Sequence, residues 1–213
     1  MSRAAPGRIE AICRRAPVIP VLVIDDAAIA EPLARALVTG GLPILEVTLR
    51  TDAALDAIKA MTRVPGATVG AGTVLNARDL ERAKQAGAEF TVSPGSTDAL
   101  LSASEAANMP LLPGAATASE AMHLLDRGYG VQKFFPASAA GGAPMLKALS
   151  GPLPQIRFCP TGGIGLDNAP DYLGLPNVLC VGGSWITPAH LVQRGEWEAI
   201  EALARQAAEL PRP

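Results

Sequence analysis

The first residue that could take part in a chemical reaction is a lysine that lies inside an otherwise apolar segment. Lys133 is the third residue of the run at 131–137, whereas Lys59, Lys84 and Lys147 lie in segments patterned as solvent-facing helices. Lysine is rarely buried without a function, and an ammonium group that loses its hydration becomes a neutral amine able to attack a carbonyl. The pattern predicts a Schiff-base lysine. The alternative is an edge-strand lysine whose flexible side chain reaches water.

A second candidate group alternates along the segment at 44–50, where Glu46, Thr48 and Arg50 recur at every second position. In a strand these three side chains share one face. If that face points into a closed sheet, a carboxylate and a guanidinium there are costly unless they are used or paired. We expect Glu46 to do acid–base work. A structural Glu46–Arg50 ion pair is the alternative, although roughly 13 Å separates the two Cα atoms in an ideal strand.

Glycine pairs mark a third kind of site near the end of the chain. Gly162-Gly163 follows the seventh predicted strand, and Gly182-Gly183 lies at the end of the eighth. Adjacent glycines let backbone N–H groups converge on an anion, and the loops after strands seven and eight of a parallel barrel commonly hold a phosphate. The glycines therefore predict a phosphate site. A tight turn is the simpler explanation for either pair alone.

Two further strand ends are candidates for lining the pocket. Thr73 ends the segment at 68–73, where it could cap a helix, contact a ligand, or do both. The glycines of this segment leave space for a ligand or another backbone. Pro94, in the stiff turn at 93–95, is expected to form part of the pocket floor.

Some classes of function lack support in the sequence. The only histidines, His123 and His190, lie in helical segments, and no metal-ligand spacing is present, so we expect no metal and no cofactor. Cys13, Cys159 and Cys180 are expected to be reduced thiols.

Charge and hydropathy set further expectations about partners and location. The formal charge of −2 gives no reason to expect a nucleic acid or a membrane as partner. No apolar run approaches the roughly 18 residues of a membrane span. Residues 1–16 lack the pattern of a signal peptide, so we expect a cytoplasmic protein.

The elements that must position these residues alternate between strands and helices along the whole chain. The predicted strands are 17–24, 44–50, 68–74, 90–94, 110–115, 131–137, 156–161 and 178–184. The clearest predicted helices between them are 27–39, 52–61, 77–86, 97–107 and 119–127. Continuous apolar strands joined by helices indicate a parallel sheet covered by helices.

This alternation predicts an α/β fold, a single (β/α)8 TIM barrel over 17–187 within one domain of residues 1–213. An N-terminal helix within 1–16 is expected to cover one end, and two helices at 188–194 and 196–209 follow the barrel. The alternative, an open doubly wound sheet, normally carries a glycine-rich fingerprint after its first strand, which is absent here.

Six segments of the chain form a recognisable set: 46–50 (EVTLR), 69–75 (VGAGTVL), 93–95 (SPG), 133–137 (KFFPA), 157–164 (RFCPTGGI) and 182–185 (GGSW). In the same order, they resemble the 2-keto-3-deoxy-6-phosphogluconate (KDPG) and 4-hydroxy-2-oxoglutarate (KHG) aldolases of the Entner–Doudoroff pathway. The resemblance implies a trimeric barrel and a class I lyase that needs no metal. Residues 138–140 depart from the more polar stretch of the family, so the resemblance does not extend to the details of this loop or to the substrate preference.

The resemblance also implies a role for each matched residue. Lys133 would form the Schiff base and Glu46 would transfer protons, on a small keto-sugar-acid phosphate substrate. The implied substrate-binding residues are Arg50 and Thr73 for the pyruvate carboxylate, Thr161 for hydroxyls, Gly162, Gly163, Gly182, Gly183 and Ser184 for the phosphate, and Pro94 and Phe135 as further contacts. Two rivals are an isomerase or epimerase that uses Glu46 as base, and a silent sugar-phosphate sensor.

Overall fold

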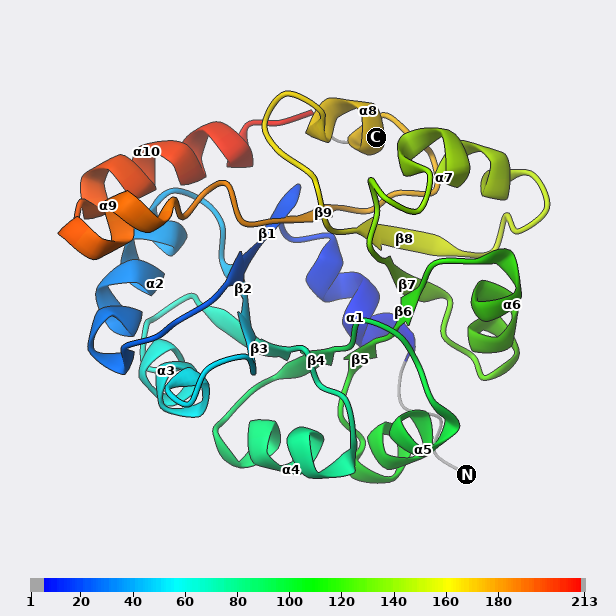
Figure 1. Cartoon of the computed structure of the whole chain (residues 1–213), viewed down its shortest axis with the longest axis horizontal. Coiled ribbons are helices and arrows are strands. Elements are labelled where there is room, and N and C mark those ends of the chain that lie inside the picture. Colours follow the sequence, from blue (N-terminus) through cyan, green and yellow to red (C-terminus); the bar gives the residue numbers. More distant parts are fainter. Residues whose placement is uncertain (1–5, 212–213) are drawn as a thin grey trace.

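A ring of parallel strands surrounded by helices forms the body of the protein in the computed structural model, which describes residues 6–211 (Figure 1). The strands are β1 (Val18–Leu22), β2 (Ile44–Thr48), β3 (Thr68–Gly72), β4 (Phe90–Val92), β5 (Leu111–Leu112), β6 (Gly114–Ala115), β7 (Val131–Phe134), β8 (Arg157–Pro160) and β9 (Val181–Gly183). The helices are α1 (Pro6–Cys13), the short 3-10 helix η1 (Ala27–Ile29), α2 (Ala30–Thr39), α3 (Ala54–Met61), α4 (Ala77–Gln85), α5 (Asp98–Ala107), α6 (Ala118–Asp126), α7 (Gly142–Ser150), α8 (Ala169–Leu173), α9 (Ala189–Arg194) and α10 (Trp197–Ala208).

The strands are hydrogen-bonded into two parallel sheets. A six-stranded sheet has the order β5-β4-β3-β2-β1-β9, and a three-stranded sheet has the order β6-β7-β8. Isolated parallel bridges, Phe158↔Val178 and Thr161↔Gly182, join β8 to the segment around β9. The α/β class with a curled parallel sheet is therefore observed, as the sequence predicts.

The predicted strand at 110–115 is wrong as one continuous element. It divides at Pro113 into β5, which pairs with β4, and β6, which pairs with β7. Proline has no N–H to donate to a ladder. Its carbonyl oxygen still accepts a hydrogen bond of 2.8 Å from the Lys133 amide, so the chain passes from one sheet to the other without losing contact with β7.

Two apolar layers hold the ring together. The larger layer fills the space between the strands and the outer helices, with Leu45, Val47 and Val69 among its members. A smaller cluster lies on the other face of the strands and includes Ile44, Val131 and Cys159. Because successive side chains of a strand alternate in direction, Glu46 and Lys133 extend from the face that carries the smaller cluster, two residues further along.

Helix α1 covers the smaller cluster. Its residues Ile9 and Cys13 belong to that cluster, and Figure 1 shows the helix across the centre of the ring. The thiols of Cys13 and Cys159 contact that of Cys180, and hydrogen bonds with these two thiols, together with burial, raise the pKa of Cys180. These cysteines are free thiols, as the sequence predicts, and all three are buried.

Four of the helices begin at a polar residue whose side chain caps the first turn. Asn76, Thr97 and Thr117 each accept a hydrogen bond from a backbone N–H in the first turn of α4, α5 and α6. Asp26 does the same for η1. Gly195 ends α9 with a φ of 67° and separates it from α10. Within residues 6–211, none of the helices is both long and apolar enough to cross a membrane.

Candidate active site

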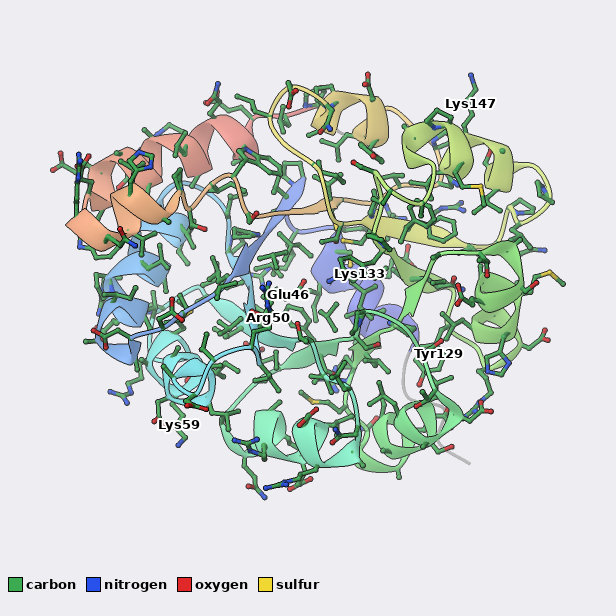
Figure 2. All side chains as sticks on the ribbon, viewed as in Figure 1. Glu46, Arg50, Lys59, Tyr129, Lys133 and Lys147 are labelled. Atoms are coloured by element: carbon green, nitrogen blue, oxygen red, sulfur yellow. The ribbon has the colours of Figure 1, made fainter. Side chains whose placement is uncertain are left out.

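A buried ion pair lies at the centre of the strand ring. Lys133 Nζ of β7 donates a hydrogen bond of 3.1 Å to Glu46 Oε1 of β2, and the two side chains are only 6% and 4% exposed. Figure 2 shows both residues at the centre, while Lys59 and Lys147 point outward from α3 and α7. The alternative of a lysine that reaches water is wrong, because the Lys133 side chain is almost fully buried.

The pair joins strands of different sheets, so it exists only because the sheet curls. β2 lies in the six-stranded sheet and β7 in the three-stranded sheet. Two opposite charges removed from water stabilise each other only with good geometry, and either one alone would be strongly destabilising. Glu46 pairs with Lys133, so the alternative of a structural Glu46–Arg50 pair is wrong.

Glycines of β3 make room for the interior side chains. A Cβ atom at Gly72 would lie 2.8 Å from Glu46 Cγ and 2.9 Å from Glu46 Cδ, and a Cβ atom at Gly70 would overlap the Phe90 ring. The sequence expectation that these glycines admit a ligand or a backbone is therefore corrected. At these two positions the space is taken by the Glu46 and Phe90 side chains of neighbouring strands.

Arg50 and Thr73 lie at adjacent strand ends. The register pairs Thr48 with Gly72, so Arg50 follows β2 by two residues and Thr73 follows β3 directly. Arg50 is exposed, and within residues 6–211 its guanidinium has no hydrogen-bond or ion-pair partner, since Glu46 pairs with Lys133 instead. Thr73 has a φ of 57°, a left-handed conformation that costs energy for a β-branched residue. Thr48, in contrast, donates to the Leu22 carbonyl at 2.9 Å and is structural.

Phe135 and Pro94 surround the lysine. Lys133 Nζ lies 5.4 Å from the centroid of the Phe135 ring, within the range of a cation–π interaction. Gly114 pairs with Lys133 across β6 and β7, and a Cβ atom at Gly114 would overlap the carbonyl group of Pro94. Phe135 therefore lies next to the lysine amine, and Pro94 lies against the strand residue that pairs with Lys133; a role for Pro94 in the pocket floor stays a prediction.

The Gly162-Gly163 turn after β8 lies beside the Gly182-Gly183 pair, which forms the end of strand β9, and the Thr161↔Gly182 bridge joins them. Gly162 and Gly163 have φ values of 104° and 71°, which favour glycine. In the described part of the chain, the N–H groups of Gly162 and Gly163 donate to no backbone or side-chain acceptor. Unpaired N–H groups in a nest of this kind are donors for an anion.

The neighbouring polar groups are also free to bind. Thr161 Oγ1 is buried and has no hydrogen-bond partner, and a Cβ atom at Gly182 would lie 2.9 Å from its methyl group. Ser184 is exposed directly after β9, and a Cβ atom at Gly183 would overlap the Trp185 ring. Gly182 and Gly183 of β9 are thus required by their neighbours, and Thr161 and Ser184 offer hydroxyl groups beside the free amides of Gly162 and Gly163.

Three residues at this site escaped the sequence analysis as functional candidates. Ser138 Oγ donates to Gly163 O at 2.8 Å, Asn168 Nδ2 donates to the same oxygen at 3.0 Å, and Tyr172 OH lies 3.4 Å from Ser138 Oγ. The only sequence signal was the departure at 138–140 that the family resemblance implies, and it concerns Ser138 alone. Among residues 6–211, no group of three or more metal-binding side chains is arranged to hold an ion.

Comparison with known proteins identifies the family. The family model described as KDPG and KHG aldolase matches residues 9–203. The chain is 54% identical over 192 residues to the 2-dehydro-3-deoxy-phosphogluconate aldolase of Pseudoalteromonas atlantica, covering 90% of this chain and 89% of that one.

Solved structures give the same result. The 2-keto-3-deoxy-6-phosphogluconate aldolase of Zymomonas mobilis with 3-phosphoglycerate is 53% identical, covers 98% of both chains and superposes with a TM-score of 0.93. The KDPG aldolase of Legionella pneumophila, with pyruvate captured as a covalent carbinolamine, is 48% identical, with a TM-score of 0.91 and coverage of 94% and 98%. The chain belongs to the KDPG and KHG aldolase family.

Proposed function

We propose that the protein is a class I aldolase that cleaves 2-keto-3-deoxy-6-phosphogluconate to pyruvate and glyceraldehyde 3-phosphate through a Schiff base on Lys133. The observation that carries the proposal is the buried Lys133 Nζ, 3.1 Å from the Glu46 carboxylate. An amine beside a proton acceptor inside a ring of strands is what carbonyl condensation needs. The carbinolamine captured in the Legionella relative supports the same chemistry.

The first half of the reaction forms the imine. Lys133 transfers a proton to Glu46, and the neutral amine attacks the C2 ketone to form a carbinolamine. Loss of the former carbonyl oxygen as water gives an iminium. Glu46 is the carboxylate within hydrogen-bond distance of the amine, so it supplies and removes protons in these steps.

The second half breaks the carbon chain. Glu46, directly or through a water molecule, removes the proton of the C4 hydroxyl, and the aldehyde departs as the C3–C4 bond breaks. The bonding electrons move to the iminium and give an enamine, which Glu46 then protonates at C3. Hydrolysis of the resulting iminium releases pyruvate and restores the amine of Lys133.

The remaining residues bind the ends of the substrate. Arg50 and Thr73 bind the carboxylate next to the ketone, a task suited to an unpaired guanidinium and a hydroxyl. Thr161 contacts a substrate hydroxyl, and Phe135 and Pro94 enclose the reacting carbons. Gly162, Gly163, Gly182, Gly183 and Ser184 bind the phosphate, which is remote from the breaking bond and positions the reacting atoms.

Three finer features belong to the same proposal. The ring is a closed (β/α)8 barrel forming one domain, supported by the bridges between β8 and β9 and by the chain continuity from β5 to β6. The enzyme is a homotrimer, supported by the family resemblance, and it is cytoplasmic, supported by the charge and hydropathy pattern of the sequence. It also cleaves 4-hydroxy-2-oxoglutarate to pyruvate and glyoxylate, supported by the description of the matching family.

Borohydride trapping tests the mechanism. The protein is incubated with pyruvate, reduced with sodium borohydride and mapped by peptide mass spectrometry. We expect one reduced pyruvyl adduct, on Lys133, with the outward-pointing Lys59 and Lys147 as internal controls. An adduct on another lysine, or none, would contradict the proposal. An isomerase that uses Glu46 as its base would give no adduct.

A further inference from the structure

Three consecutive peptide groups determine the orientation of the glycine loop at 161–164. The carbonyl oxygen of Thr161 accepts from the Ala137 amide at 2.8 Å, and that of Gly162 accepts from the Ser138 amide at 3.0 Å. The carbonyl oxygen of Gly163 accepts instead from two side chains, Ser138 Oγ at 2.8 Å and Asn168 Nδ2 at 3.0 Å. All three oxygens are therefore held.

Fixing a carbonyl group fixes the next N–H group as well. In a trans peptide the C=O of one residue and the N–H of the next point in opposite directions. The three held oxygens thus direct the N–H groups of Gly162, Gly163 and Ile164 away from their hydrogen-bond donors. In the described part of the chain, none of these N–H groups donates to a protein acceptor.

The third peptide group differs from the first two because only side chains hold it. Gly163 has a φ of 71° and no side chain to resist rotation of the following peptide group. A Cβ atom there would lie 2.6 Å from Ser138 Oγ, so the glycine allows the serine to approach. Loss of both side-chain donors would leave this carbonyl free to turn.

The other ends of the two donors are also fixed. Asn168 precedes α8 without capping it, and its Oδ1 accepts from the Gly165 amide at 2.8 Å. Tyr172 is buried, and its hydroxyl lies 3.4 Å from Ser138 Oγ. Because the Ser138 proton is used toward Gly163, Tyr172 is the donor of that pair. The serine is held from both sides.

We propose that Ser138, assisted by Asn168, is a positioning residue that orients the Ile164 N–H toward the substrate phosphate. It need not touch the substrate. The inference rests on the proposed function, because it assumes that the loop binds the phosphate group. It adds that the phosphate affinity depends on a hydroxyl on the turn after β7.

The test compares substrates with and without a phosphate. For Ser138→Ala we expect KM for 2-keto-3-deoxy-6-phosphogluconate to rise about 5-fold and kcat to change less than about 2-fold, as for one lost hydrogen bond. Competitive inhibition by inorganic phosphate should weaken by a similar factor. For the double variant with Asn168→Ala we expect a rise of about 10- to 20-fold, less than the fully additive value because both donors share one oxygen.

Two readouts should not move. Kinetics with 4-hydroxy-2-oxoglutarate and borohydride trapping of pyruvate on Lys133 involve no phosphate, so the Ser138→Ala variant should match the wild type in both. Ser138→Thr keeps the hydroxyl and should restore the wild-type KM. Ser150→Ala is the matched control, because Ser150 Oγ also donates to a backbone carbonyl at 2.8 Å, on α7.

The outcomes separate the inference from the proposed function. Equal losses with both substrates, no rise in KM, or no inhibition of the wild type by inorganic phosphate would each overturn the positioning role. Failure of the wild type to trap pyruvate on Lys133 would overturn the proposed function itself. A selective loss with the phosphorylated substrate, restored by threonine, supports the inference.

Discussion

The two halves of the candidate site are built from different parts of the chain. The Lys133–Glu46 pair consists of two side chains from strands of different sheets, buried and joined at 3.1 Å. The glycine loop at 161–164 presents backbone N–H groups, and residues outside it determine their direction. The first half depends on which side chains are present, and the second depends on how the peptide groups are held.

The largest expected effect comes from removing the amine. Lys133→Met should lower kcat/KM by at least about 10⁴-fold and abolish pyruvate trapping, because no nucleophile remains. It should also lower the free energy of unfolding by about 3–5 kcal/mol, because Glu46 is left buried and unpaired. Steady-state kinetics and urea denaturation measure the two effects.

The double variant Lys133→Met with Glu46→Gln is the control for the stability part. It removes both charges and should recover much of the lost free energy of unfolding while remaining inactive. If the double variant is as unstable as the single one, the ion pair is not the source of the effect. Retained activity in either variant would contradict the role of the lysine.

The next largest effect on activity is expected from a substitution in β3. The new Cβ atom in Gly72→Ala would overlap the Glu46 carboxyl group and displace it from Lys133, so we expect kcat with both substrates to fall about 10²-fold. Gly151→Ala is the matched control, because nothing lies within 4 Å of a Cβ atom there. Kinetics of the two variants check this prediction, and an unaffected Gly72→Ala enzyme would show that the carboxylate position is not critical.

The corresponding change in the glycine loop should be selective. Gly163→Ala adds a Cβ atom 2.6 Å from Ser138 Oγ and strains a residue with a φ of 71°. We expect KM for the phosphorylated substrate to rise about 10-fold, with the rate of pyruvate trapping kept within about 2-fold. Equal loss of trapping would mean that the two halves of the site are not separable in this way.

The sequence predicted the side-chain half better than the backbone half. Lysine in an apolar strand and glutamate at period two are unusual residue types in recognisable positions, so Lys133 and Glu46 could be singled out. Their pairing could not, because it depends on the curvature that brings β2 and β7 into one interior. Arg50 was the only partner for Glu46 that the spacing suggested.

The glycine loop shows the opposite limit. The Gly162-Gly163 pair can be recognised from the sequence. The donors that fix the carbonyl oxygens cannot, because they come from a turn and from the residue before a helix. An exposed Ser138 and a half-buried Asn168 carry no local signature. The division of the predicted strand at Pro113 is a similar case, since each half pairs with a different sheet.

The smallest expected effect concerns a residue outside both halves of the site, and it serves as a reference for the effects within them. In the capping box of α6, Glu120 accepts hydrogen bonds from the Ala116 and Thr117 amides at 2.8 and 2.9 Å. The hydrogen bond from Ala116, with those from the Thr117 hydroxyl and amide, lowers the pKa of Glu120. Glu120→Gln should cost a few tenths to about 1 kcal/mol at neutral pH, since the group is exposed.

The sign of the pH dependence follows from the lowered pKa of Glu120. The charge of Glu120 stabilises the fold above the ordinary carboxyl pKa, and this contribution is lost as the pH falls through the lowered value. Urea denaturation of both proteins should show a difference at neutral pH that disappears in acid, with unchanged kinetics on both substrates. A change in phosphate affinity or pyruvate trapping in Glu120→Gln would contradict this prediction. It would mean that a stability loss of this size alters the kinetics by itself. Only the larger losses in Lys133→Met and Gly72→Ala could then be assigned to one half of the site.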